Sequence, residues 1–315
     1  MTEKTFDILC VGIIVADQLV KPVDRGIFDV DATRVDEIKV MPGGDAMNEA
    51  IILSRLGRRV GLVGKVGEDQ FGKMVLRQAE ENGVDVGNVK VDGSVVTSTS
   101  IVLINKNGDR NFVYCAGNND KLSLEDIDLS ILNRTKIVSI GSVLGLAALD
   151  GAGAKALFKE AQAGGAVTSA DTNHDSRRLG FDGVRGVLQY TDIFIPSYDE
   201  ARYLTNETEP ERMCDIFLGC GVKTVVIKNG ARGCFIKNRE ESIVLPAYKA
   251  RAIDTTGAGD NFVAGFLTGI SMGWDLKKCG MLANATGALS TEEIGATSAV
   301  RSIDQVKAFM DKNKI

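Results

Sequence analysis

The sequence predicts an α/β fold: a doubly wound, mostly parallel sheet flanked by helices, with a small β-sheet lid. Two observations predict it. Apolar, β-branched runs alternate with helix-period segments along most of the 315 residues. Two segments, 16–42 and 96–116, break this alternation with short runs of strand character. Sheets of this kind bind ligands beyond the carboxyl ends of their strands, so a site is expected there.

The elements follow one another in a regular order. Strands are expected where β-branched and apolar residues cluster, at 6–14, 59–67, 136–143, 166–172, 192–197 and 223–229. Helices are expected where apolar residues recur three and four positions apart, at 45–57, 69–82, 151–164, 198–205, 211–220, 260–272, 275–291 and 303–313. The main α/β domain would then consist of residues 1–15, 43–95 and 117–315. Residues 16–42 and 96–116 would form the lid inserted in it.

A hairpin is predicted in the second lid segment, where Asn107-Gly108 separates two apolar runs. Asn-Gly is strong hairpin chemistry, because both central positions of the tight turn need a positive φ. The exposed edges of so small a sheet allow a homodimer through the lid, since unpaired edges are usually covered. A monomer stays open.

Composition excludes several classes of protein. The formal charge of 37 − 42 = −5 disfavours a broad nucleic-acid-binding surface, although a local anion site stays allowed. No apolar run approaches the roughly 20 residues that span a bilayer, so no membrane partner is expected. Six cysteines without a CxxC pair, and an N-terminus without a signal peptide, predict a cytoplasmic protein. The 35 glycines beside only 5 prolines predict turns and close approaches of backbone to ligand.

The sharpest motif is a glycine-rich turn that leads into a helix starting near Asp260. The turn is built from Thr256, Gly257, Ala258 and Gly259. Free N–H groups and the positive end of the helix dipole make such a start an anion site. Alone, Asp260 is an ordinary helix-start residue. A carboxylate beside preorganised amides is also what transfer of phosphate to a hydroxyl needs.

A second motif lies at residues 42–57, where Gly43-Gly44 precedes an amphipathic helix. Asn48, in the first turns of this helix, can offer one donor and one acceptor to a hydroxyl-rich ligand. On its own, a Gly-Gly pair before a helix is most often only a loop.

Together the two motifs resemble both signatures of the PfkB carbohydrate kinase family, the ribokinase-like sugar and nucleoside kinases. The resemblance covers essentially the whole chain, and it implies a ribokinase-like fold with ATP and Mg²⁺ as cofactors. It makes Asp260 the general base and the amides of residues 257–260 the anion hole. Asp254 and Thr256 match positions that bind a monovalent cation such as K⁺ in many members. Equally, these two residues could only cap the turn.

Looser matches extend the predicted site. By the resemblance, Asp17 would hydrogen-bond sugar hydroxyls, although a lone Asp after a strand is more often a turn residue. Glu200 would act on Mg²⁺ through water. Ser197 replaces the Asn that the family has three residues earlier, which leaves that contact in doubt.

The nucleotide side is matched at two places. Lys228, Gly230 and Gly233 are similar to the family's nucleotide loop, where Lys228 could reach a phosphate or be a solvated strand-end lysine. Asn284 resembles an adenine-pocket residue and could equally be structural.

The resemblance therefore predicts ATP-dependent phosphorylation of a hydroxymethyl group on a small sugar. Asp45 and Glu49 beside the Gly-Gly junction disfavour a phosphorylated sugar, so an unphosphorylated ribose or ketohexose is preferred. Lys106 and Arg110 in the lid could reverse this preference, because their direction is unknown. The alternatives are a keto-sugar-acid kinase, a nucleoside kinase, or a non-catalytic sugar or nucleotide sensor.

Overall fold

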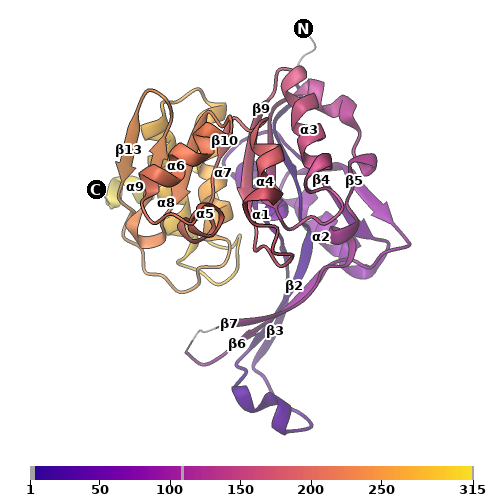
Figure 1. The fold of residues 1–315 in the computed structure, drawn as a ribbon. Helices are drawn as coiled ribbons and strands as arrows, with labels where there is room; N and C mark the ends of the chain where they lie inside the picture. The colour runs from indigo at the N-terminus through magenta and orange to yellow at the C-terminus, as the bar shows by residue number, and fades with distance from the viewer. Residues whose placement is uncertain (1–3, 108–109, 314–315) are drawn as a thin grey trace.

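A large sheet forms the centre of the computed structural model, which describes residues 4–107 and 110–313 (Figure 1). In this part of the chain the sheet has nine strands, in the order β13-β12-β11-β10-β9-β8-β1-β4-β5. All pairs from β11 to β5 are parallel, and the antiparallel pairs are β11-β12 and β12-β13, at one edge. The strands are β1 (Phe6–Val11), β4 (Val60–Gly67), β5 (Asp85–Asp92), β8 (Thr135–Val143), β9 (Val167–Thr172), β10 (Ile193–Phe194), β11 (Thr224–Lys228), β12 (Cys234–Lys237) and β13 (Ser242–Leu245).

Helices cover both faces of this sheet, as the alternation of elements predicts. One apolar cluster joins the sheet to α1 (Asp45–Arg55), α2 (Gln70–Glu81), α7 (Ala258–Ser271), α8 (Leu276–Ser290) and α9 (Ile303–Lys312). The other joins the opposite face to α3 (Ala152–Ala163), α4 (Gly180–Leu188), α5 (Tyr198–Thr205) and α6 (Pro210–Gly219). Successive residues of β1 alternate between the clusters, with Ile8 in the first and Leu9 in the second. The predicted doubly wound α/β fold is confirmed.

A second sheet projects away from the first and forms the lid (Figure 1). Its order is β3-β2-β6-β7, with β2 (Val15–Lys21), β3 (Glu37–Gly43), β6 (Thr99–Ile104) and β7 (Arg110–Cys115). The predicted hairpin is present as the antiparallel pair β6-β7, while Gly108 of its turn lies outside the described residues.

Several elements differ from the sequence prediction. The run 6–14 is not one strand: β1 ends at Val11 and the chain re-enters a strand, β2, at Val15 in the other sheet. Strand β5, helix α4 and the β12-β13 hairpin were not predicted. Helix α7 begins at Ala258, two residues before the expected start. Among the described residues, no helix is long and apolar enough to cross a membrane.

Strand register decides which lid residues face the same way. Asp17 of β2 pairs with Ser100, and Ser100 pairs with Tyr114 of β7. Arg110 lies four positions before Tyr114 on that strand, and side chains of a strand alternate faces with a period of two. Asp17 and Arg110 therefore belong to one face of the lid.

Candidate active site

The start of α7 has the form of an anion site. Gly257 is the N-cap residue with φ +70°, and a Cβ there would lie 2.6 Å from Cβ of Ala296. Glycine thus allows both the left-handed turn and the close approach of the loop around Ala296. The N-cap residue has no side chain to accept from the first-turn N–H groups, although Ala258 N–H donates to Thr255 O at 3.2 Å. The remaining amides and the helix dipole favour an anion here.

Asp260 is held in this first turn by Asn48 of α1. Asn48 Nδ2 donates to Asp260 Oδ2 at 2.7 Å, which leaves Oδ1 as the oxygen that can take a proton from a ligand. Burial, and next the negative charge of Asp45, raise the pKa of Asp260 well above the usual value of an aspartate. Asn48 Oδ1 is buried without a hydrogen-bond partner among the described residues. A ligand hydroxyl can supply that partner.

The other residues predicted for the sugar gather at the same end of α1. A Cβ on Gly43 would lie 2.0 Å from Asp17 Oδ2, so the lid carboxylate lies directly against this junction. Gly44 has φ +92°, and a Cβ there would lie 2.5 Å from Ile13 O. Burial, with a smaller contribution from the charge of Asp45, raises the pKa of Asp17 to about 6. The structure therefore brings the Gly-Gly junction, Asp17, Asn48 and Asp260 together.

Asp45 is a residue that the motif comparison left without a role in binding. Its Oδ2 accepts from Ser142 Oγ at 2.9 Å and from Asn173 Nδ2 at 2.7 Å, which fixes the carboxylate at the start of α1. Burial raises the pKa of this carboxyl also. The signal for it in the sequence was its place directly after Gly43-Gly44. The side of the site predicted to bind the sugar is thus lined by carboxylates.

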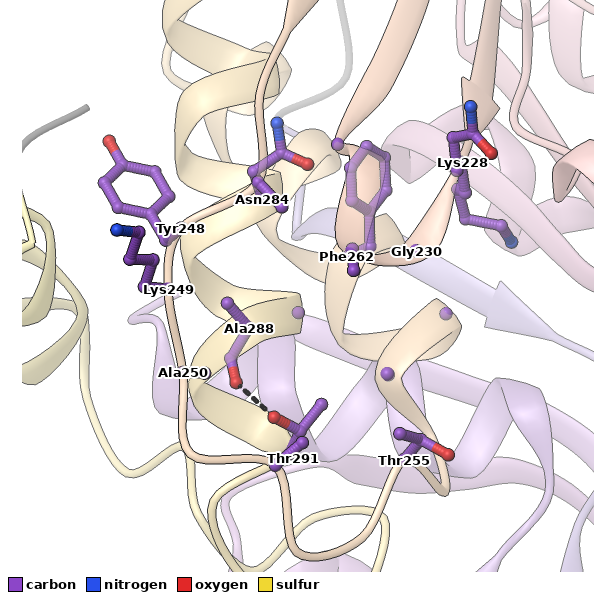
Figure 2. A pocket seen from close by; sticks show the side chains of 18 of the residues that line it. Lys228, Gly230, Tyr248, Lys249, Ala250, Thr255, Phe262, Asn284, Ala288 and Thr291 are labelled. Carbon is purple, nitrogen blue, oxygen red and sulfur yellow. Dashed lines mark hydrogen bonds between the residues drawn. The ribbon is translucent and has the colours of Figure 1, made fainter.

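A cavity of about 690 Å³ opens beside the start of α7, between the β11–β12 loop and helices α7 and α8 (Figure 2). Cavities of this size hold a ligand as large as a nucleotide. All four residues predicted to bind the nucleotide line it, namely Lys228, Gly230, Gly233 and Asn284. Its lining also includes residues without a motif that could have announced them, such as Tyr248, Thr255, Phe262, Ala288 and Thr291 (Figure 2).

Lys228 lies between this cavity and the first turn of α7. Its Nζ forms an ion pair with Asp171, and the two side chains are only 12% and 5% exposed. A Cβ on Gly259 would lie 3.5 Å from Lys228 Nζ, so the ammonium group is next to the first turn of α7. Burial alone would lower the pKa of Lys228, but the charges of Asp171 and Glu200 outweigh it and raise that pKa. The group is a permanent cation beside the anion site.

Comparison with known proteins identifies this arrangement. A family model of the pfkB family carbohydrate kinases matches residues 5–303. The chain belongs to the PfkB carbohydrate kinase family. The chain is 29% identical to fructokinase-1 of Zea mays over 287 residues. This alignment covers 86% of this chain and 88% of that one. It is also 29% identical over 319 residues to the ATP-dependent 6-phosphofructokinase of Thermoanaerobacterium thermosaccharolyticum, covering 99% and 96%.

Solved structures agree with the family. A candidate ribokinase II of Escherichia coli, in complex with ATP and Mg²⁺, superposes with a TM-score of 0.86 and 26% identity. The match covers 98% of this chain and 99% of that one. The ribokinase of Thermotoga maritima has the same fold, with a TM-score of 0.83, 23% identity and coverage of 97% and 99%. The chain is therefore a carbohydrate kinase with a ribokinase-like fold.

Glu200, which was matched to Mg²⁺ chemistry, also caps a helix together with Ser197. Ser197 Oγ accepts from Glu200 N–H at 3.3 Å, and Glu200 Oε2 accepts from Ser197 N–H at 2.7 Å. This capping box starts α5 and explains why Ser can stand in place of the family's Asn. Within the described residues no group of three or more acidic, His or Cys side chains could hold a metal ion. Mg²⁺ usually keeps several waters and binds through phosphates, so one fixed carboxylate fits it.

Asp254 and Thr256, which were matched to a monovalent cation, lie next to an arginine of the lid in this kinase. Asp254 Oδ1 accepts from Thr256 N–H at 2.7 Å, and Asp254 Oδ2 accepts from Gly295 N–H at 2.8 Å. Arg110 of the lid forms an ion pair with Asp254 Oδ1. The Asp254 carboxylate, which was expected to bind K⁺, is already paired with the guanidinium group of Arg110. Asp254 and Thr256 therefore do not fit an additional K⁺ well.

Proposed function

We propose that this kinase transfers the γ-phosphoryl group of ATP to a hydroxymethyl group of a small, unphosphorylated sugar of the ribose or ketohexose type. The observation that carries the proposal is Asp260, which is fixed by Asn48 beside the uncapped start of α7. The 690 Å³ cavity opens on the nucleotide side of that start, and the carboxylates lie on the sugar side.

The chemistry follows from these positions. The acceptor hydroxyl would lie against Asp260 Oδ1, which takes its proton as the hydroxyl oxygen attacks the γ-phosphorus. The bond from that phosphorus to the leaving oxygen of ADP breaks at the same time. The amides of residues 257–260 and the Lys228 ammonium would balance the charge on the transferring group. Mg²⁺ bound with the nucleotide would neutralise phosphate charge, and Glu200 is the residue that would face it through water.

Charge supports a neutral acceptor. Asp17, Asp45 and Asp260 lie around the sugar side, and a sugar phosphate placed among them would be repelled. Arg110, which could have served such a phosphate, is paired with Asp254 instead. The 6-phosphofructokinase relative makes this a real choice, because it is as similar in sequence as the fructokinase.

The test follows ADP release with ribose, fructose and fructose 6-phosphate, in wild type and in Asp260→Asn. Wild type should turn over an unphosphorylated sugar, and the variant should lose about 10²–10⁴-fold in kcat. Asp199→Asn, on the exposed side of α5, is the matched control and should keep full activity. Equal ADP release by wild type and Asp260→Asn with every sugar would refute the kinase mechanism. Turnover of fructose 6-phosphate alone would refute the substrate preference.

A homodimer through the lid is also proposed. Ile101 pairs with Val113, so both lie on the face opposite Arg110, and they are 37% and 56% exposed. A partner that covers this apolar face would be a second copy. Light scattering should give twice the mass of the chain, and Ile101→Lys should return it to a monomer. A cytoplasmic location stays a prediction.

A further inference from the structure

Arg110 makes a contact that joins two distant parts of the chain. It begins β7 in the lid, yet its Nη1 is paired with Asp254 Oδ1 and its Nη2 donates to Thr255 Oγ1 at 3.1 Å. The Arg110 side chain is 17% exposed and Asp254 is 6% exposed. A guanidinium group that is this buried and bound at two neighbouring residues is held in one geometry.

Asp254 in turn shapes the loop that forms the anion hole. It accepts from the N–H groups of Thr256 and Gly295, and so ties the turn before α7 to the loop at residues 295–296. Gly257 packs against Ala296 of that same loop, and Asn261 Nδ2 donates to Ala296 O at 2.7 Å. A change at Asp254 would therefore move the amides that begin α7.

The Asp254 carboxylate is stabilised in this place by two backbone N–H groups and by a cation. Burial acts to raise its pKa, but hydrogen bonds from Thr256 and Gly295 and the charge of Arg110 bring it below the usual value. The group is thus ionised and buried, and a buried charge is costly unless it is paired. Among the described residues, Arg110 is the only side chain that forms an ion pair with it.

We propose that Arg110 is a positioning residue, a cation supplied by the lid that holds the anion-hole loop in shape in place of a dissolved monovalent cation. This inference rests on the proposed function, because the loop it positions is the proposed phosphate site. It predicts that the kinase needs no K⁺, and that removing the guanidinium group creates a need for it.

The experiment compares wild type with Arg110→Met and Arg110→Lys, in KCl and in choline chloride of equal ionic strength. Wild-type kcat/KM should change less than twofold between the salts. Arg110→Met should lose about 10- to 100-fold in choline, and K⁺ should restore at least fivefold, because the bared carboxylate can then bind the ion. Arg110→Lys keeps one charge and should stay insensitive to K⁺ with an intermediate rate. Lys39→Met, an exposed lysine on β3 of the same sheet, is the control and should match wild type.

Thermal unfolding in the same two salts gives a readout that does not depend on turnover. Wild type should melt at the same temperature in both salts, and Arg110→Met should melt higher in K⁺ than in choline. Activation of wild type by K⁺ of fivefold or more, or an Arg110→Met variant that matches wild type in choline, would overturn the inference. If wild type proves inactive with every sugar, the proposed function fails, while the two melting curves still decide the role of Arg110.

Discussion

Replacing Gly257 with alanine should destabilise the kinase by about 3 kcal/mol, for two separable reasons. A residue with a side chain at φ +70° costs about 1–2 kcal/mol of backbone strain. The new Cβ would also lie 2.6 Å from Cβ and 2.8 Å from Cα of Ala296, and such overpacking costs about 1–3 kcal/mol. Loss of glycine's freedom in the unfolded chain returns about 0.4–1 kcal/mol.

The chain offers a matched control for the first of these reasons. Gly273, just after α7, has φ +72°, and a Cβ there would meet nothing within 4 Å. Gly273→Ala should therefore show the strain without the clash and cost about 1 kcal/mol. The difference of about 2 kcal/mol between the two variants measures the contact between Gly257 and Ala296.

Urea denaturation of both variants and wild type is the assay, with thermal unfolding as a check. In a chain of 315 residues a loss of about 3 kcal/mol lowers Tm by about 4–5 °C. Gly257→Ala should also lose activity more than Gly273→Ala, because the clash moves the first turn of α7. If the two variants prove equally stable, the close packing of the turn against Ala296 is refuted.

Three further predictions concern the charges around α7. Gly259→Ala should fold at least as stably as wild type, because its Cβ meets only the Lys228 side chain, 3.5 Å from Nζ and 3.9 Å from Cε. The variant should nevertheless lose 10- to 1000-fold in kcat/KM by crowding the proposed anion hole, and unchanged kcat/KM would contradict that placement of the phosphate. Because burial raises the pKa of Asp260, and the base must be ionised to work, kcat/KM should fall on the acid side well above pH 4. A pH–rate profile that stays flat down to pH 4 would exclude Asp260 as the base. Lys228→Met should lower the free energy of unfolding by about 3–5 kcal/mol, measured by urea denaturation, because it leaves Asp171 buried without its cation. Adding Asp171→Asn should recover most of that loss. Additive losses would show that the two groups are not coupled.

The parts of the site that depend on local sequence could be predicted. The start of α7 needs only a turn glycine followed by helix-forming residues. The predicted start, at residue 260, lies two residues after the observed start at Ala258. The capping box at Ser197 and Glu200 also had a local signal, Ser-x-x-Glu before a helix, which a comparison with the family's Asn obscured. Both features are decided by hydrogen bonds within one turn of the chain.

Tertiary packing decided what the sequence did not predict. Helix α4 contains three glycines in nine residues, which makes it a poor helix by propensity. It forms because Val184, Val187 and Leu188 are buried against the sheet. Strand β5 is half exposed at the edge of the sheet, so its residues lack the apolar run expected of a parallel strand. In both elements burial outweighs local preference.

Contacts between residues far apart in the sequence could not be predicted, because they too depend on tertiary packing. Asn48 and Asp260 are 212 residues apart, and Arg110 and Asp254 are 144 apart. The first pair meets because α1 and α7 pack side by side, and the second because strand β7 of the lid lies against the loop before α7. Whether the Arg110 side chain points toward the substrate bears on the choice between a phosphorylated and a neutral sugar. That direction depends on the orientation of the lid, which local sequence does not determine.

The pairing of the cations also bears on the proposed role of Asp260 as a base. Lys228 is bound by Asp171 and Arg110 by Asp254, so each of these two cations has a carboxylate partner other than Asp260. Asp260 instead accepts a hydrogen bond from a neutral donor, Asn48, and its pKa is raised by burial and next by the charge of Asp45. A direct pair with Lys228 would lower the pKa of Asp260 and make it a weak base. Because Lys228 is paired with Asp171 and not with Asp260, it could serve the phosphate without removing the basicity that the proposed proton transfer needs.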